Sequence, residues 1–425
     1  MSHKYFFHFL QAQQISLLES MDLQYNSFNE QLIDEFINKE IQEGFPGAAL
    51  IIVRDGKILK QTVYGHKLKY DENEKLLAQP QLLTLDTMFD LASLTKMYAT
   101  NYALMQLVDQ GKLNVDDPIQ KYITEYSGCN PENEYRETRL VKDLLTHTAG
   151  YAPSVEFYDP ARVLPDLYSQ DKRQTEQIII TKLGFERSKG GDHIPVYSDI
   201  DYMLLGFIVE RISGMGLDQY VKVNFYQPLG LTHTLFNPLK DARYQKSDFA
   251  ATEVKGNTRG GTIIFPNVCT YVIQGQVHDE KSAYSLGGIS GHAGLFSNLH
   301  DMAILCQIML NNGTYQDLRF WSKNVQDLFV TPYERDPSFG LGWRLNRNKS
   351  LPWFGLYASE EAYGHTGWTG NCSVIDPKYS LAIVLLTNKR HTPCINGIFD
   401  GEKYETGKYG KIMTLVYESL LFTTN

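Results

Sequence analysis

Residues 90–96 read Asp-Leu-Ala-Ser-Leu-Thr-Lys, and apolar residues at helical spacing follow them as far as Gly111. If a helix opens at Ser93, the side chain of Lys96 lies on the same face one turn later. A lysine accepts the proton of a serine hydroxyl when burial or neighbouring cations lower the lysine pKa. Backbone N–H groups at the helix start also favour a developing oxyanion. The spacing predicts a nucleophilic Ser93 with Lys96 as its partner; the alternative is a capping serine and a solvated lysine.

Two more polar segments precede elements of predicted regular structure. Residues 197–199 read Tyr-Ser-Asp and stand before a helical pattern, and residues 364–370 read Gly-His-Thr-Gly-Trp-Thr-Gly and stand before strand-like runs. Taken alone, Tyr197 is a packed core tyrosine, and Asp199 or Ser198 is a helix cap. The Ser-x-x-Lys spacing is also frequent by chance. Only the combination of the three segments is specific.

In this order, Ser-x-x-Lys, Tyr-x-Asp and His-Thr-Gly resemble the signature of the serine β-lactamase and penicillin-binding protein family. Other segments resemble its class C β-lactamase-like branch, peptidase family S12: residues 107–113, 116–118, 144–150 and 202–206. Some resemble the penicillin-binding protein 4B group, the D-alanyl-D-alanine carboxypeptidases of that branch: residues 90–100, 197–206, 275–281 and 287–297. The resemblance runs from about residue 28 to the end. It implies an α+β fold, an antiparallel sheet flanked by helices with a mostly helical inserted region.

The resemblance also implies an activity and a set of site residues. Ser93 would attack the carbonyl of a D-Ala-D-Ala amide or a β-lactam, and Lys96 and Tyr197 would move the proton. The backbone N–H groups of Ser93 and Trp368 would hold the oxyanion. The implied substrate-binding residues are Asp199, His365, Thr366, Gly367 and Trp368. The implied partners are peptidoglycan stem peptides, with β-lactams as inhibitors and with no cofactor or metal.

Two positions depart from the common pattern of this family. His365 stands where many relatives have lysine, so we expect its charge to titrate near neutral pH and carboxylate binding to weaken as the pH rises. Asp199 stands where asparagine is usual, and an ionised carboxylate only accepts hydrogen bonds. This difference argues against ordinary β-lactam recognition. Two alternatives to the carboxypeptidase therefore stay open: an esterase of the same fold, and a catalytically weak peptidoglycan- or penicillin-binding protein.

Composition narrows the class of partner. The formal net charge is -9 and no dense Lys/Arg run occurs, which disfavours binding to nucleic acid or to anionic membrane surfaces. The first residues lack a clear signal-peptide core, and no apolar run approaches the roughly 20 residues of a membrane-spanning helix. A periplasmic or envelope location with inner-membrane association follows from the resemblance alone. The five cysteines, at 129, 269, 306, 372 and 394, form no metal-binding or redox pair.

The chain reads as strands, a mostly helical stretch, and strands again. Predicted strands occupy residues 48–53, 58–64, 339–345, 371–376 and 381–387. Predicted helices occupy residues 26–43, 94–108, 141–145, 202–212, 302–309 and 412–421. We expect residues 1–27 to be an extension and residues 28–425 one domain. Its sheet layer would come from about 28–90 and 330–425, and its helical region from about 91–329.

Several further polar residues have a structural interpretation beside a functional one. His147 is expected to form structural hydrogen bonds. A group of polar residues lacks a recognised ligand spacing, which disfavours a metal site: His278, Asp279, Glu280 and His292. Residues 288–292 do not form the Gly-x-Ser-x-Gly motif of an α/β-hydrolase. The polar, glycine-rich stretch 240–297 is typical of a functional loop region.

Overall fold

The computed structural model describes residues 28–127, 136–186 and 194–422. The predicted extension, residues 1–27, lies outside the described residues, as does Cys129. Seven strands form one antiparallel sheet in the order β3-β2-β1-β12-β11-β10-β9. They are β1 (Gly47–Arg54), β2 (Lys57–Tyr70), β3 (Leu76–Leu82), β9 (Arg344–Leu345), β10 (Tyr363–Gly367), β11 (Asn371–Asp376) and β12 (Leu381–Thr387).

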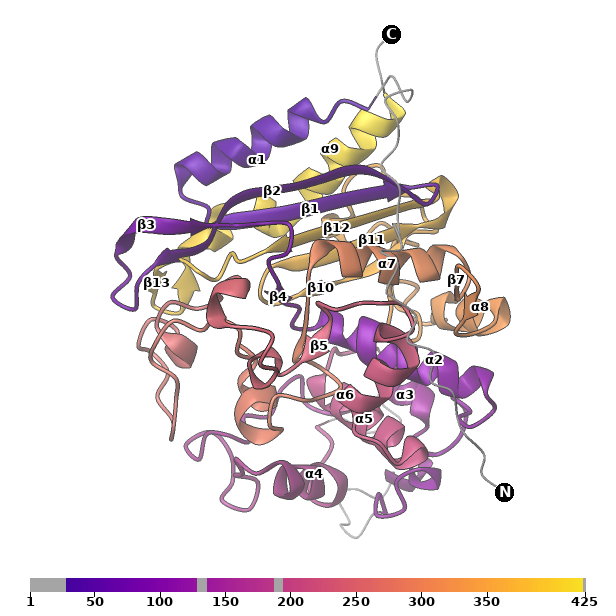
Figure 1. Cartoon of the computed structure of the whole chain (residues 1–425). Helices are drawn as coiled ribbons and strands as arrows, with labels where there is room; N and C mark the ends of the chain where they lie inside the picture. The colour runs from indigo at the N-terminus through magenta and orange to yellow at the C-terminus, as the bar shows by residue number, and fades with distance from the viewer. Residues whose placement is uncertain (1–27, 128–135, 187–193, 423–425) are drawn as a thin grey trace, which may run out of the picture.

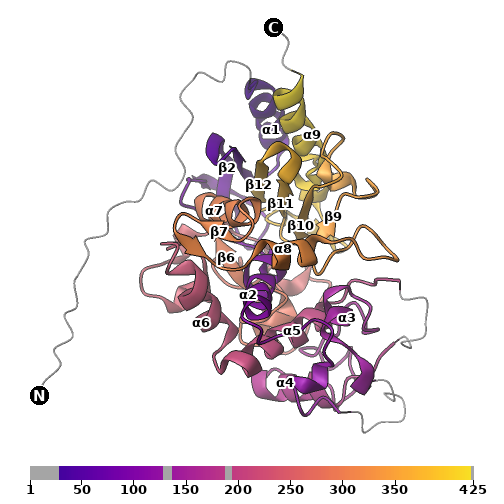
Figure 2. The same cartoon turned by 90° about the vertical axis from the view of Figure 1, so that its right-hand side faces the viewer.

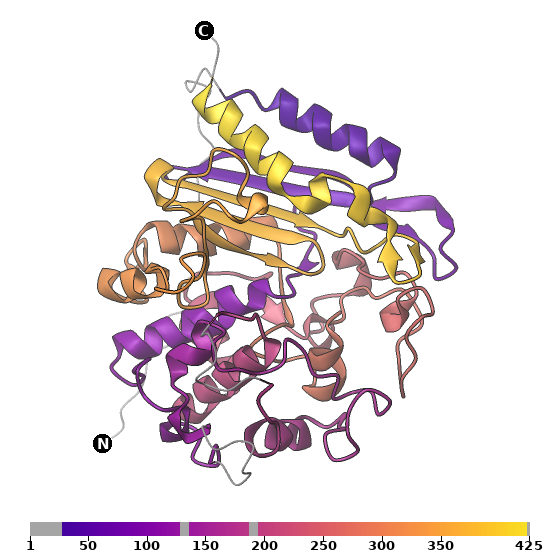
Figure 3. The ribbon, with the colours of Figure 1, turned by 180° about the vertical axis from the view of Figure 1, so that it is seen from behind.

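Two helices from opposite ends of the chain cover one face of this sheet (Figures 1 and 3). They are α1 (Gln31–Glu43) and α9 (Gly410–Leu421). Leu50 and Ile52 of β1 point into a core shared with Ile37 of α1 and Ile412 of α9. Because strand side chains alternate between faces, the intervening Ile51 points the other way. Apolar residues on both faces explain why the central strands are continuous hydrophobic runs.

The second face packs on the helical part of the molecule, which lies on one side of the sheet (Figures 1 and 2). Ile51 and Val384 share a core with residues of three helices: α2 (Tyr102–Asp109), α5 (Asp199–Ser213) and α7 (Leu299–Leu310). The other helices are α3 (Val141–Leu145), α4 (Lys172–Thr181), α6 (Leu217–Val221) and α8 (Lys323–Val330). No helix in the described part of the chain has the length and apolar character needed to cross a membrane.

Short strands form three small sheets beside the large one. The first has the order β4-β6-β5: β4 (Phe89–Asp90), β6 (Leu295–Ser297) and β5 (Leu235–Phe236). The other two are hairpins: β7 (Thr314–Tyr315) with β8 (Leu318–Arg319), and β13 (Cys394–Ile395) with β14 (Ile398–Phe399). The first of these sheets brings the residues just before Ser93 against the segment near residue 295.

The predicted α+β class with an antiparallel sheet is confirmed. The strands at 371–376 and 381–387 and the helix at 141–145 have the predicted bounds. The strand predicted at 339–345 is wrong, since only Arg344 and Leu345 pair in β9. Gly342, at φ 86°, breaks the extended run before it. α7, which belongs to the predicted helical region, packs against β1 and β12.

Candidate active site

Ser93 lies just after β4, in a turn that the backbone holds in an unusual conformation. Ala92 has φ 46°, in the left-handed region that most side chains avoid. The Asp90 carboxylate accepts a hydrogen bond from the Ala92 N–H at 2.9 Å and stabilises this turn. Ser93 itself is half-buried. The turn therefore presents the serine hydroxyl while the residues on either side of it are enclosed.

The predicted Ser93 and Lys96 pair comes together. Lys96 Nζ donates to Ser93 Oγ at 3.0 Å, and the lysine is fully buried. The turn of helix that begins at Lys96 is a π-helix, Lys96–Asn101, which leads into α2. Insertions of π-helical geometry are frequent at functional sites, where they re-aim a side chain.

The surroundings of Lys96 favour its charged form. Its Nζ donates to three acceptors: Ser93 Oγ, the Asp199 carboxylate at 2.8 Å and the His292 carbonyl at 3.1 Å. Burial lowers the pKa of Lys96, but the charge of Asp199 and the Tyr197 phenol raise it overall. The nearest charge is thus a carboxylate and not a cation, and the lowered pKa that would let Lys96 accept the serine proton is not present at rest.

Tyr197 stands over Lys96 and between two histidine rings. Lys96 Nζ is 4.9 Å from the centre of the Tyr197 ring, and the His147 and His365 rings lie at 4.7 and 5.9 Å. Burial raises the pKa of Tyr197, while Lys96 and a hydrogen bond with Ser93 oppose this rise. His147 Nδ1 is 2.8 Å from an oxygen of Asp201. This contact agrees with the structural role expected for His147.

Asp199 is the first residue of α5, and its carboxylate faces the lysine. Ser198 is the cap, since its Oγ accepts a hydrogen bond from Ile200 N at 3.2 Å. The two Asp199 oxygens pair with different cations: Oδ1 with Lys96 at 2.8 Å and Oδ2 with Lys281 at 3.4 Å. The alternative of a capping residue thus applies to Ser198. Burial raises the pKa of Asp199, but Lys96 and Lys281 lower it further and hold it below its usual range.

Lys281 is a site residue that the sequence analysis missed. It belongs to the π-helical turn Lys281–Ser285 and also pairs with Asp279 at 3.0 Å. The oxygens of Asp199 and Asp279 and a ring nitrogen of His292 lie within 4.8 Å of one another, close enough to hold a metal ion. The ammonium groups of Lys96 and Lys281 already pair with these two carboxylates. The donor set is therefore that of an ion-pair network. The signals for it in the sequence are the charged triplet at 279–281 and the family-like segment 275–281 that this triplet ends.

The His-Thr-Gly segment forms the second half of β10 and contacts the serine turn. A Cβ on Gly367 would lie 2.4 Å from the Leu91 carbonyl oxygen, so only glycine permits this approach. Thr369 Oγ1 and Asn371 Nδ2 each donate to the carbonyl oxygen of Asp90 at 2.7 Å. These contacts fasten the end of β10 to the turn that carries Ser93.

The strand edge beside Ser93 is open. On one side β10 pairs with β11 along its whole length, but on the other side only Tyr363 and Gly364 pair with β9. Beyond Gly364, this outer edge has no strand partner among the described residues. Thr366 is half-buried, and Trp368, the first residue after the strand, is 41% exposed.

His365 does not carry the switchable charge expected of it. Its side chain is buried, and burial together with nearby Lys96 lowers its pKa to about 3. The expectation that it titrates near neutral pH is therefore wrong. Its Nδ1 lies 2.7 Å from the Thr366 carbonyl oxygen and donates to it. His365 is a neutral group at ordinary pH.

The Trp368 ring is held in place by its neighbours. It stacks on the His278 ring at 4.7 Å between ring centres. The guanidinium groups of Arg390 and Arg259 lie 3.9 and 4.6 Å from its centre, as in cation–π contacts. His278 is thus a packing partner of Trp368.

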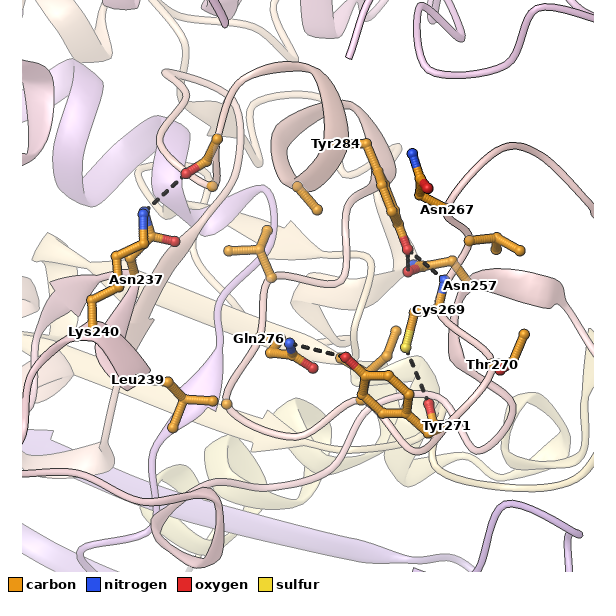
Figure 4. Close-up of a pocket in the computed structure, with 17 residues that line it drawn as sticks. Asn237, Leu239, Lys240, Asn257, Asn267, Cys269, Thr270, Tyr271, Gln276 and Tyr284 are labelled. Atoms are coloured by element: carbon orange, nitrogen blue, oxygen red, sulfur yellow. Dashed lines mark hydrogen bonds between the residues drawn. The ribbon is translucent and has the colours of Figure 1, made fainter. Parts of the chain in front are cut away.

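A separate cavity of about 600 Å³ lies in the 237–288 region, and none of the predicted site residues lines it (Figure 4). Amide and phenol groups form much of its wall. Tyr284 Oη donates to Asn257 at 3.0 Å, and Gln276 Nε2 donates to Tyr271 Oη at 3.3 Å. The stretch expected to be a functional loop region therefore contributes both to this cavity and, through Lys281, to the Ser93 site.

A family model described as Beta-lactamase matches residues 29–395. The chain belongs to the beta-lactamase family. Within this family it is 46% identical to "N-acetylmuramyl-L-alanine amidase" of Bacillus subtilis (strain 168), over 95% of this chain and 92% of that protein. It is 45% identical to "Putative D-alanyl-D-alanine carboxypeptidase" of Escherichia coli (strain K12), over 91% of this chain and 90% of that one.

A solved structure shows the same beta-lactamase-like fold. The octameric penicillin-binding protein homologue from Pyrococcus abyssi superposes with a TM-score of 0.65 at 20% identity, over 93% of this chain and 78% of that chain. The family and its relatives make this chain a serine hydrolase. The family predicted from the sequence is confirmed.

Proposed function

We propose that Ser93 is the acylated nucleophile of this hydrolase and that Lys96 and Tyr197 move its proton. The hydrogen bond of 3.0 Å between Lys96 Nζ and Ser93 Oγ is the observation that carries this proposal. The opening turn of a helix, with Ala92 in a left-handed conformation, supports it because such strain gathers where a residue must be presented.

The reaction follows from these positions. Ser93 Oγ bonds to the substrate carbonyl carbon as its proton leaves for the Lys96 and Tyr197 pair. The backbone N–H groups of Ser93 and Trp368 hold the oxyanion. The carbon–nitrogen bond then breaks, and the pair returns the proton to the leaving amine. Water attacks the acyl-serine by the reverse route and restores the hydroxyl.

We infer that an extended substrate adds to the open edge of β10. Residues His365 to Gly367 leave this edge without a strand partner among the described residues. Main-chain hydrogen bonds from an added strand would align the substrate carbonyl with the serine turn that Gly367 contacts. Thr366 and Trp368 border the same edge.

The first candidate activity is that of a D-alanyl-D-alanine carboxypeptidase acting on peptidoglycan stem peptides. Its substrate ends in a carboxylate, which needs a cation because His365 is neutral. Arg344 can supply this cation. It lies opposite Gly364 across the β9 and β10 pair, is close enough to lower the pKa of His365, and forms no ion pair with a carboxylate of the described residues.

The second candidate is hydrolysis of the amide between a muramyl lactyl group and L-alanine. The neutral His365 favours it, because this amide in a longer peptide has no carboxylate next to the bond that breaks. The name of the Bacillus subtilis relative supports it as well. The substrates of both candidate activities are peptidoglycan fragments. This implies action at the cell envelope. Fractionation of the native host tests that location.

One product analysis separates the candidates. The protein and its Ser93→Ala variant are incubated with an acyl-D-Ala-D-Ala tripeptide, a muramyl dipeptide and a short-chain ester, and products are identified by mass. Ser93-dependent release of D-alanine supports the carboxypeptidase, and Arg344→Gln should then raise KM for the tripeptide alone. Release of N-acetylmuramic acid, or of ester products only, would replace that activity by the amidase or the esterase. No turnover of any substrate would contradict the catalytic proposal.

A further inference from the structure

Five residues close a ring of polar contacts behind Ser93. Lys96 Nζ pairs with Asp199 Oδ1 at 2.8 Å, and Asp199 Oδ2 pairs with Lys281 Nζ at 3.4 Å. Lys281 Nζ pairs with Asp279 Oδ2 at 3.0 Å, and Asp279 Oδ1 lies 2.8 Å from His292 Nε2. The His292 carbonyl accepts from Lys96 at 3.1 Å and completes the ring.

The ring is enclosed, so its charges act on one another strongly. The side chains of Lys96, Lys281 and His292 are 0%, 10% and 1% exposed, and those of Asp199 and Asp279 are 15% and 19% exposed. Two ammonium groups face two carboxylates in this space. Removing one member changes the potential at every other member more than it would at the surface.

Lys96 has conflicting duties within this ring. As a cation it satisfies Asp199, but it must lose a proton before it can accept one from Ser93. With Asp199 alone as a neighbour, that loss would leave a buried carboxylate without a partner. Lys281 stays next to the same carboxylate on its other oxygen. The carboxylate therefore keeps one cation when Lys96 is neutral.

We propose that Lys281 is a positioning residue for the Ser93 reaction: it shares Asp199 with Lys96 and so allows Lys96 to release its proton. This inference rests on the proposed function of Ser93. Asp279 has the opposite influence, because it draws Lys281 away from Asp199 and adds a negative charge to the ring. Lys281 thus favours the loss of the Lys96 proton, and Asp279 opposes it.

Other charged or titratable groups also surround Lys96. They are Tyr197 just before α5, Asp199 and Tyr202 on α5, His292 near β6, His147, and His365 on β10, with Arg344 on β9 close to the two last histidines. Of these groups, only Asp199 and His292 contact residue 281 or 279, and both are members of the ring. Differences between variants at residues 281 and 279 therefore report the ring.

The test measures the rate at which a fluorophosphonate labels Ser93, from pH 6 to 9, by intact-protein mass. In this step the serine oxygen bonds to phosphorus, fluoride leaves and the serine proton passes to Lys96. The probe requires no peptide or β-lactam recognition. We expect the rate to rise with pH, because Lys96 must be neutral to act.

Three variants and one control give opposed expectations. Lys281→Met should move the profile about one pH unit upward, which is on the order of tenfold slower labelling at a fixed pH. Lys281→Arg should restore most of the rate, and Asp279→Asn should move the profile downward. The matched control is Lys255→Met, which removes a lysine that pairs with Glu74 at 2.9 Å, away from the ring. It should leave the profile unchanged.

The outcomes separate this inference from the proposed function. If the native protein is not labelled at Ser93, the proposed function fails. If it is labelled, and Lys281→Met and Asp279→Asn both keep the native profile or both shift it in the same direction, the role of Lys281 is overturned. Thermal unfolding identifies a variant that has lost its fold. If Lys281→Met does not fold, Asp279→Asn carries the decision, since a merely structural role would not move the pH profile downward.

Discussion

At the scale of single residues, Asp199 has the largest influence on the proton chemistry of the site. An asparagine there would offer an amide, whereas this carboxylate pairs with Lys96 and Lys281. Its charge keeps Lys96 protonated at rest. A carboxylate between two buried ammonium groups also contributes to stability, because removing it leaves both cations without their partner.

Replacing Asp199 with asparagine should lower the free energy of unfolding by about 3 kcal/mol. The pKa of Asp199 is lower in the folded state than its usual value. Its contribution is therefore fully present above about pH 4 and is lost only as the pH falls through the lower folded value. Urea unfolding of both proteins from pH 5 to 9 should give a constant difference. A difference that vanishes at pH 5 would contradict this account.

The His365 side chain should stay neutral from pH 5 to 9, because burial and Lys96 lower its pKa to about 3. Substrate binding should then show no pH dependence from this residue in that range. A histidine NMR titration, with His365→Gln to assign the signal, measures this directly. A midpoint between pH 5.5 and 8 for that signal would show that the carboxylate-binding charge is switchable after all.

At the scale of elements, the site is the contact between the turn after β4 and the end of β10. Much of each element could be predicted, because apolar spacing marks the helix after Ser93 and strong strand runs mark β11 and β12. The contact between the turn after β4 and the end of β10 could not be predicted from local sequence patterns. The Asp90 carbonyl accepts from Thr369 and Asn371, residues almost three hundred positions away.

A methyl group on Gly367 should separate these two elements. The added Cβ would lie 2.4 Å from the Leu91 carbonyl, which is backbone and cannot rotate away. We expect Gly367→Ala to slow Ser93 labelling by about 100-fold, as a displacement near 1 Å does in other active sites. Gly230→Ala is the control for lost stability, since its φ of 69° strains an added Cβ while no atom lies within 4 Å of it. Equal labelling rates for the two variants would count against this contact.

At the scale of the whole molecule, both ends of the chain build one sheet and α7 joins that sheet to the helical part. Leu305 of α7 is buried in the core shared by both, and its carbonyl accepts a hydrogen bond from Tyr102 of α2. The sequence pattern could place α7 in the inserted region but not against the sheet. Packing between distant segments also produces the neutral His365 and the position of Lys281. Neither feature can be predicted from the periodicity of the sequence.

We therefore propose that residues 28–425 unfold as one unit. Leu305→Ala should cost about 3 kcal/mol through the cavity it leaves and lower the stability of sheet and helical region together. Far-UV circular dichroism and tryptophan fluorescence, followed in urea, should report coincident transitions in both proteins. Two separated transitions, with only one moved by the substitution, would divide the chain into two domains.

The proposed acylation of Ser93 can be tested by intact-protein mass after brief exposure to a fluorophosphonate, followed by peptide mapping. We expect one added phosphonyl group on the native chain, located at Ser93, and none on Ser93→Ala. A native chain that gains no mass, or a Ser93→Ala chain labelled to the same extent, would contradict it.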